Sequence, residues 1–305
     1  MDPPRWTSRS AVLFGLTVLA WATNYVFVRV GLHSASPLWL AALRTSVGLA
    51  GFGVYLLWIH SGDRLDSRKK VLALLLGIPN SAVFFGLWFV AAVSVPAGQA
   101  AVIIYTFPLW VALFSFPLLG HRLSFRHWSL VGLGFAGVLL VSQPWQETDL
   151  HATVVPLLEL LGAAVSWALA TVLAQRTFRP TELLAMNGYQ LLAGAAILLG
   201  AAAVLDPRHP PVSTSLSLWI SVAWMGLLGT SFAYAVWFWL LGRFSAPTLS
   251  VYAFLVPIVA LGASALFLQE RLVPVQAVGV VLVLSSIYGI ARTGERRSVL
   301  EPSAG

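Results

Sequence analysis

Residues 77–123 read GIPNSAVFFGLWFVAAVSVPAGQAAVIIYTFPLWVALFSFPLLGHRL, and residues 226–272 read GLLGTSFAYAVWFWLLGRFSAPTLSVYAFLVPIVALGASALFLQERL. A shift of 149 positions superposes the two stretches without a gap. The residues that punctuate the apolar runs coincide: Trp88-Phe89 falls on Trp237-Phe238, Pro108 on Pro257, and Arg122-Leu123 on Arg271-Leu272. Chance seldom matches tryptophan, proline and arginine together, so the chain is predicted to consist of two related halves.

The composition is that of a membrane protein. Of the 305 residues, 58% are hydrophobic and only 10% are charged, whereas roughly 25% charged residues are usual in soluble domains. The net charge of +7 comes from short connections between apolar runs, which indicates membrane topology and not a nucleic-acid partner. The chain has no cysteine, which excludes disulfides, thiol catalysis and thiolate metal sites. Because no cleavage pattern follows Arg5 and Arg9, the first apolar run is predicted to be a retained helix.

Ten mostly apolar runs are long enough to cross a bilayer as helices, which takes about 17–25 residues. We therefore predict an all-α membrane protein with ten transmembrane helices. Short connections make neighbouring helices antiparallel. The runs cover residues 11–31, 37–60, 70–92, 96–118, 126–143, 154–176, 182–204, 217–241, 246–269 and 274–292.

The distribution of Lys and Arg orients these helices. With a cytoplasmic N-terminus, 14 of the 18 basic residues fall in cytoplasmic segments and only Arg208 and Arg271 fall outside. Arg29 and Arg44 lie within helices. Because cytoplasmic connections are enriched in basic residues, both termini are predicted to be cytoplasmic.

Five helices per half is an odd number, so the second half enters the membrane from the opposite side to the first. The starts of the halves also match, since Trp21-Ala22 falls on Trp167-Ala168 at a shift of 146. An inverted-topology repeat of this kind is typical of secondary transporters. The predicted units are a five-helix repeat at residues 1–148, a second at 149–293, and a disordered cytoplasmic tail at 294–305.

Several residues in order along the chain carry a family resemblance. They are Trp21-Ala22-Thr23-Asn24 in the first helix, Arg44 in the second, Pro108 and Pro257 in the fourth and ninth, and Glu270-Arg271-Leu272 before the tenth. With the five-plus-five repeat, they resemble the drug/metabolite transporter (DMT) superfamily, EamA type. One departure is His121, where the family's first half usually has Glu. The density of Trp and Tyr is similar to that of YddG-type exporters of aromatic and other amino acids.

The resemblance implies a central cavity lined by the first, third, fourth, sixth, eighth and ninth helices, with the fifth and tenth at the periphery. It also implies export, a place in the bacterial inner membrane and no cofactor. Glycines such as Gly132, Gly134 and Gly137 in the fifth helix are expected to allow close helix packing.

Three charged residues lie within predicted helices: Arg29, Arg44 and Glu159. The topology places all three in the outer third of the membrane, where charges are costly and opposite charges can neutralise one another. One interpretation is a structural charge network. The other is functional: Arg29 or Arg44 attracts a substrate carboxylate, or Glu159 takes up a proton. The sequence leaves both open.

Aromatic and polar residues away from the run ends are candidates for binding an amphiphilic substrate, because they offer flat apolar walls with polar tips. Trp21 and Trp167 are repeat mates near mid-membrane, and Asn80, Phe84 and Trp88 share one helix face. Helix packing is the alternative for each of them. The candidate set is Trp21, Asn24, Tyr25, Asn80, Phe84, Trp88, Gln99, Tyr105, Trp167, Thr171, Tyr234, Trp237 and Tyr252. Because the halves are inverted, Trp88 is expected toward the outer face and Trp237 toward the inner face, as equivalent parts of two gates.

Pro108 and Pro257 lie in the middle of predicted helices, where each removes a backbone hydrogen bond. They are candidate hinges, with a fixed bend as the alternative.

The predicted function is secondary transport by alternating access, exporting small amphiphilic metabolites such as amino acids, aromatic ones included. The partners are then a small-molecule substrate and the lipid bilayer, with proton coupling open. Export of drugs or other metabolites is the alternative. An intramembrane enzyme is a remote possibility, because all six histidines fall at helix ends or in connections and no metal-spaced pair occurs.

Overall fold

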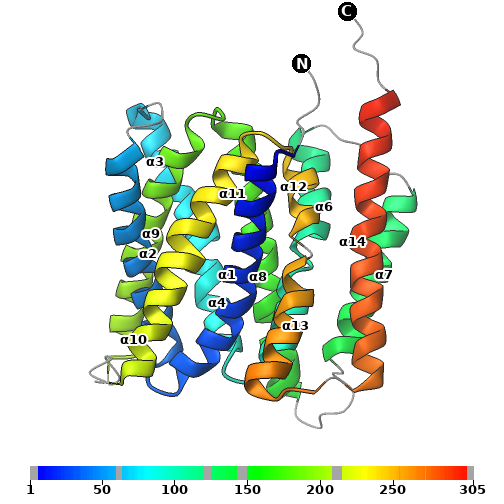
Figure 1. The fold of residues 1–305 in the computed structure, drawn as a ribbon, viewed down its shortest axis with the longest axis horizontal. Coiled ribbons are helices and arrows are strands. Elements are labelled where there is room, and N and C mark those ends of the chain that lie inside the picture. Colours follow the sequence, from blue (N-terminus) through cyan, green and yellow to red (C-terminus); the bar gives the residue numbers. More distant parts are fainter. Residues whose placement is uncertain are drawn as a thin grey trace, which may run out of the picture.

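The computed structural model is a bundle of helices that run side by side (Figure 1). It describes residues 6–59, 64–119, 125–142, 150–207, 215–253, 255–271 and 273–300, and these contain no strand. The first helix begins and the last helix ends at the same end of the bundle (Figure 1). The basic turn at residues 121–123 lies outside the described residues.

Within the described residues each of the ten apolar runs consists of one or more helices, which confirms the all-α prediction. Eight are long and apolar enough to span a membrane, and the helices α7 and α14 contribute shorter apolar stretches, Trp128–Val141 and Pro274–Ser286. Six runs are unbroken helices: α1 (Ser8–Leu32), α2 (Pro37–Ile59), α7 (Phe125–Ser142), α8 (Leu150–Thr177), α9 (Leu183–Leu205) and α14 (Pro274–Leu300).

The third and eighth runs contain a π-helix, which the sequence patterns do not predict. The third consists of α3 (Ser67–Gly77), η1 (Ile78–Val83) and α4 (Phe84–Ala91); the eighth consists of α10 (Leu216–Ala223), η2 (Trp224–Phe232) and α11 (Ala233–Leu241). The shift of 149 positions places η1 on residues 227–232, within η2. The two halves therefore share a local structural irregularity as well as sequence similarity. Short π-helices are frequent at functional sites.

The fourth and ninth runs are each broken near the middle. The fourth consists of α5 (Ala97–Ile104) and α6 (Phe107–Leu119), and the ninth of α12 (Ala246–Tyr252) and α13 (Leu255–Leu268). Both breaks come just before a proline, Pro108 in one and Pro257 in the other. Proline lacks the N–H that would bond to the preceding turn, and its ring crowds that turn, so the break falls where expected.

The helices α7 and α14 pack against each other at one edge of the bundle (Figure 1). Gly137 and Gly279 form the closest crossing, because a Cβ on either would lie 2.6 Å from the carbonyl oxygen of the other. At Gly132, by contrast, a Cβ would meet nothing within 4 Å. Close packing through glycine is thus confirmed at Gly137, while Gly132 leaves room for a side chain.

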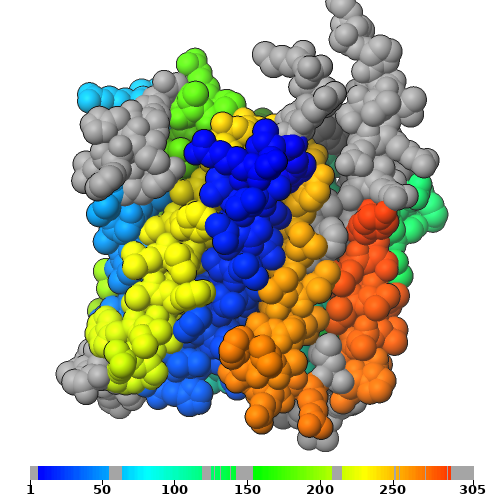
Figure 2. Space-filling view, in the orientation of Figure 1, coloured from blue at the N-terminus to red at the C-terminus, as the bar shows by residue number. Residues whose placement is uncertain are grey.

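Figure 2 shows the lower part of α14 (orange to red) at the margin of the molecule, beside the orange segment that precedes it. This helix continues to Leu300, so residues 294–300 are helical where a disordered tail was expected. Residues 301–305 of that tail lie outside the described part of the chain.

Polar side chains hold several helix ends, and two of these contacts, those of Glu270 and of Lys69, join the first predicted repeat to the second. The carboxylate of Glu270 accepts hydrogen bonds from the backbone N–H groups of Ala97 (2.8 Å) and Gly98 (3.0 Å), which begin α5. At the repeat-equivalent start of α12, the side-chain oxygen of Gln175 accepts from the N–H of Ala246 at 2.7 Å, but this glutamine comes from the same repeat. Elsewhere Lys69 pairs with Glu182, with Nζ to Oε1 at 2.6 Å.

Candidate functional site

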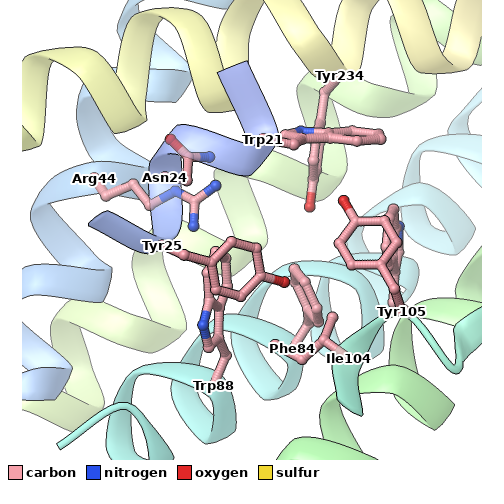
Figure 3. Close-up of a pocket in the computed structure, with 10 residues that line it drawn as sticks. Trp21, Asn24, Tyr25, Arg44, Phe84, Trp88, Ile104, Tyr105 and Tyr234 are labelled. Atoms are coloured by element: carbon pink, nitrogen blue, oxygen red, sulfur yellow. The ribbon is translucent and has the colours of Figure 1, made fainter. Parts of the chain in front are cut away.

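A narrow cavity lies among the central helices (Figure 3). Its free volume is about 20 Å³, roughly the room that one ordered water molecule needs. Its walls come from both halves of the chain. The lining residues are Trp21, Asn24, Tyr25, Arg44, Phe84, Trp88, Ile104, Tyr105, Trp167 and Tyr234.

Helical spacing brings several of these residues to one face. Trp21, Asn24 and Tyr25 follow one another by three and one positions in α1, so they lie within one turn. The indole N–H of Trp21 donates to the carbonyl oxygen of Gly229 in η2 at 3.1 Å, which fixes the ring. A Cβ on Gly229 would lie only 2.2 Å from Nδ2 of Asn24, so glycine lets α1 approach η2.

Aromatic rings make the apolar walls. Trp167 in α8 stacks on Phe107, with ring centroids 4.0 Å apart and planes at 24°. It also lies 5.3 Å from Phe84 and 5.5 Å from Trp21. Interlocked rings at these separations stabilise one another and give a flat, rigid surface, which suits an aromatic or aliphatic body.

Arg44 in α2 is the charged residue of the cavity. Its side chain is 1% exposed. Nε donates to the hydroxyl oxygen of Thr230 at 3.1 Å, and the guanidinium carbon lies 4.0 Å from the ring centroid of Phe85 and 5.1 Å from that of Trp88. These ring faces stabilise the cation electrostatically. Nη1 has no hydrogen-bond partner among the described residues.

Other lining residues also carry buried polar atoms that have no partner within the described part of the chain. They are both amide atoms of Asn24, the indole nitrogens of Trp88 and Trp167, and the hydroxyl of Tyr234. Figure 3 shows the hydroxyls of Tyr25, Tyr105 and Tyr234 pointing into the space between them. Buried polar groups are nearly always hydrogen-bonded, so a cluster of free ones around a cavity is a set of sites for a polar ligand.

The cavity brings together eight of the thirteen substrate-binding candidates: Trp21, Asn24, Tyr25, Phe84, Trp88, Tyr105, Trp167 and Tyr234. Trp237 packs behind it, 5.5 Å from Trp21 and 5.7 Å from Trp167. Asn80 and Thr171 are buried, with side chains unpaired among the described residues, but they do not line it.

The remaining two candidates lie away from the cavity. Gln99 is half-buried near the start of α5. Tyr252 ends α12 and packs edge-on against Trp6 at 5.0 Å. Sequence spacing places both residues on the right helices but does not show which way their faces turn.

Several residues of the site were not anticipated. Ile104 lines the cavity, and Phe85, Phe107 and Thr230 support it from behind. The second helix contributes Arg44, whereas none of the described lining residues comes from the ninth run, contrary to what the family resemblance implied. The charge of Arg44 within an apolar run was the available signal; an isoleucine in an apolar run gives none.

The three charges within helices do not form the structural network that was one of the two interpretations of their positions. Among the described residues the structure has a single ion pair, Lys69–Glu182. Arg29 instead donates through Nη1 to the carbonyl oxygens of Ala92 (2.8 Å) and Val93 (3.0 Å), and Glu159 is half-buried on α8. The equal depth that the predicted topology gives these residues does not by itself bring their side chains together.

Glu182 lies just before α9, outside the apolar span. Burial raises the pKa of this carboxyl, but the Lys69 ammonium and the backbone N–H of Arg179 (2.8 Å) outweigh it and hold the pKa below its ordinary value. The described residues contain no group of three or more His, Cys, Asp or Glu that could hold a metal ion.

Fold and cavity define a multi-pass helical membrane protein with an aromatic, polar-tipped site between its two halves. The chain belongs to the EamA-like transporter family, because the sequence model of that family matches residues 9–143 and again residues 155–292. It is therefore a membrane transporter of the drug/metabolite superfamily, and the resemblance drawn from the sequence is confirmed.

Similar proteins cover nearly the whole chain. The "Uncharacterized transporter YoaV" of Bacillus subtilis (strain 168) is 26% identical and aligns with 94% of this chain and 99% of its own length. A "Probable amino-acid metabolite efflux pump" of Escherichia coli (strain K12) is 28% identical over 92% of this chain and 94% of its own. The "Uncharacterized inner membrane transporter YedA" of the same strain is 28% identical over 81% and 79%. A crystal structure at 20% identity shares the fold, with a TM-score of 0.71 over 96% of this chain and 99% of the other.

Proposed function

We propose that this protein is a secondary transporter of the bacterial inner membrane that exports amino acids, aromatic ones included, or metabolites derived from them. The observation that carries the proposal is the central cavity, whose walls are aromatic and whose buried polar atoms lack partners among the described residues. The names of the relatives from Escherichia coli support the direction, the substrate class and the membrane. A transporter of this kind needs neither a cofactor nor enzymatic chemistry.

The proposed architecture is a five-plus-five inverted repeat with both termini in the cytoplasm. Four observations support it: the shift of 149 positions, the π-helix in each half, the helix break before each of two equivalent prolines, and the two segments that match the family. The bias of basic residues supports the cytoplasmic termini.

Alternating access follows from this architecture, because inverted halves can rock about a site at their interface. The breaks before Pro108 and Pro257 are the proposed hinges, since a helix interrupted there can bend without losing further hydrogen bonds. Trp88 and Trp237 are the proposed equivalent gate residues, with Trp88 on the cavity wall and Trp237 packed behind it.

Energy coupling can be tested at Glu159. This carboxylate is half-buried within a membrane-spanning segment, a position that is costly for a charge and typical of proton relays. If Glu159 takes up a proton during the cycle, Glu159→Gln abolishes the stimulation of flux by a pH gradient. A normal pH profile in this variant excludes the residue from coupling.

The experiment that tests the function is flux in proteoliposomes, with Trp, Phe, Met and Thr as substrates and with or without a pH gradient. We expect saturable flux of at least one of these amino acids. Trp167→Ala is expected to reduce flux because it removes the ring at the centre of the cavity wall, whereas Trp128→Ala, at a tryptophan 55% exposed on α7, serves as the matched control. Absence of flux for all four substrates contradicts the amino-acid assignment, and equal flux in both variants contradicts the cavity as the route.

A further inference from the structure

The charge of the cavity is one-sided. Arg44 is buried in its wall, and the carboxylates whose side chains the structure places lie elsewhere. Glu182 is paired with Lys69, Glu270 caps α5, Asp66 caps α3, and neither Glu159 nor Asp206 is among the lining residues. The described lining therefore carries a cation without an acid.

The protein satisfies this cation only in part. Thr230 accepts one hydrogen bond, and the rings of Phe85 and Trp88 face the guanidinium, but Nη1 remains unpaired within the described residues. A buried charge is strongly unfavourable unless it is paired and hydrogen-bonded. A ligand carboxylate would supply both, because its two oxygens match the fork of the guanidinium.

An ammonium group on the same ligand has no such complement. In an amino acid it stands next to the carboxylate, so it would lie close to Arg44 and be repelled by it. Its available acceptors are neutral, such as the Asn24 carbonyl and the tyrosine hydroxyls. Ring faces can bind an ammonium, but those of Phe85 and Trp88 already face the guanidinium of Arg44.

We propose that the cavity selects organic anions: molecules with one carboxylate on an aromatic or large apolar body and no charged ammonium group. N-acylated amino acids and aryl or indolyl carboxylates belong to this class. The inference rests on the proposed function and sharpens its substrate from amino acids to their derivatives that lack the amine charge. Arg44 holds the carboxylate, and the rings of Trp21, Trp167 and Phe84 contact the body.

The test compares ligands that share one indole body. Binding to the purified full-length protein in nanodiscs is measured by calorimetry with N-acetyltryptophan (anion), tryptophan (zwitterion), N-acetyltryptophanamide (neutral) and tryptamine (cation). We expect N-acetyltryptophan to bind at least about tenfold more tightly than tryptophan, because removing the amine charge removes its desolvation and its repulsion from Arg44. Tryptamine is expected to bind most weakly.

The outcomes separate this inference from the proposed function. If tryptophan binds as tightly as N-acetyltryptophan or more tightly, the anion preference is wrong and the amino-acid transporter stands. If none of the four ligands binds, the cavity is not a site for indole amphiphiles and this inference is overturned, whereas the proposed function is decided by the flux of the four amino acids.

The variant Arg44→Gln tests whether Arg44 is the residue responsible for the preference for anions. Gln190 occupies the position of Arg44 in the second repeat, at a shift of 146, and is itself buried in α9. A glutamine is therefore a residue that this helix position accommodates in the other half. We expect the variant to bind N-acetyltryptophan about 100-fold more weakly while its affinity for N-acetyltryptophanamide changes less than about threefold, since only the former pairs with the guanidinium. Retained amide binding shows that the cavity is folded; an equal loss for acid and amide overturns the assignment.

Discussion

Gly229→Ala is expected to disturb the cavity wall through a single added methyl group. That Cβ would lie 2.2 Å from Nδ2 and 2.5 Å from Oδ1 of Asn24. Asn24 is 1% exposed, so its amide can move only into the cavity or by pushing α1 from η2. Either movement also strains the 3.1 Å hydrogen bond from Trp21 to the Gly229 carbonyl.

The magnitude follows from these contacts. Overpacking a filled site costs about 1–3 kcal/mol, and losing an interhelical hydrogen bond within a membrane adds about 0.6 kcal/mol. We therefore expect the variant to lose about 2–4 kcal/mol of unfolding free energy, and its flux to fall because Trp21 and Asn24 line the cavity. Unfolding in mixed micelles of increasing SDS content measures the free energy.

A double-mutant cycle tests the reasoning. Asn24→Ala removes the atoms that the new Cβ would meet, so Gly229→Ala is expected to cost at least about 1 kcal/mol less in that background than in the wild type. An equal cost in both backgrounds would refute the proposed clash and locate the effect of the alanine elsewhere.

Three further expectations concern stability. Gly137→Ala is expected to destabilise the α7–α14 crossing by about 1–3 kcal/mol, whereas Gly132→Ala stays within about 0.5 kcal/mol; equal SDS-unfolding effects would contradict the 2.6 Å approach to Gly279. Glu270→Ala is expected to cost about 1 kcal/mol by removing the acceptor for two N–H groups of α5, and a thermal midpoint no lower than that of Arg271→Ala would argue against this cap. The pKa of Glu182 is lower in the folded protein than its ordinary 4.5, so its contribution is complete above that pH and is lost as pH falls through the folded value. Between pH 7 and pH 4, the melting temperature of Glu182→Gln should therefore fall less than that of the wild type; parallel curves would contradict the assignment.

Sequence patterns predict those features of the fold that depend on the length of apolar runs and on the positions of prolines and repeated residues. Run length gives the helices, and the paired prolines give the helix breaks. The repeat indicates Trp21 and Trp167 as equivalent candidate binding residues, and both line the cavity. These features follow from local chemistry, which a sequence carries directly.

Features that depend on the rotation of one helix against another could not be predicted. Gln99 and Tyr252 lie on expected helices but do not line the cavity. Arg29 and Glu159, which the predicted topology places at the depth of Arg44, form no ion pair among the described residues. The π-helices were missed because neither Pro79 nor Gly229 alone implies a wider turn. The hydrogen bond between Arg44 and Thr230 joins residues 186 positions apart, which no short-range pattern reveals.

The most direct test of the cavity as the transport pathway uses the absence of cysteine from the natural sequence. Ile104→Cys places a single thiol on the cavity wall. In oriented vesicles, a membrane-impermeant thiol reagent is applied to one face at a time, with and without N-acetyltryptophan or tryptophan. Alternating access predicts that the thiol is labelled from either face. It also predicts that labelling is slower in the presence of N-acetyltryptophan or tryptophan, if that compound binds in the cavity. Labelling from one face only, or at a rate that no substrate changes, would contradict a pathway through this cavity.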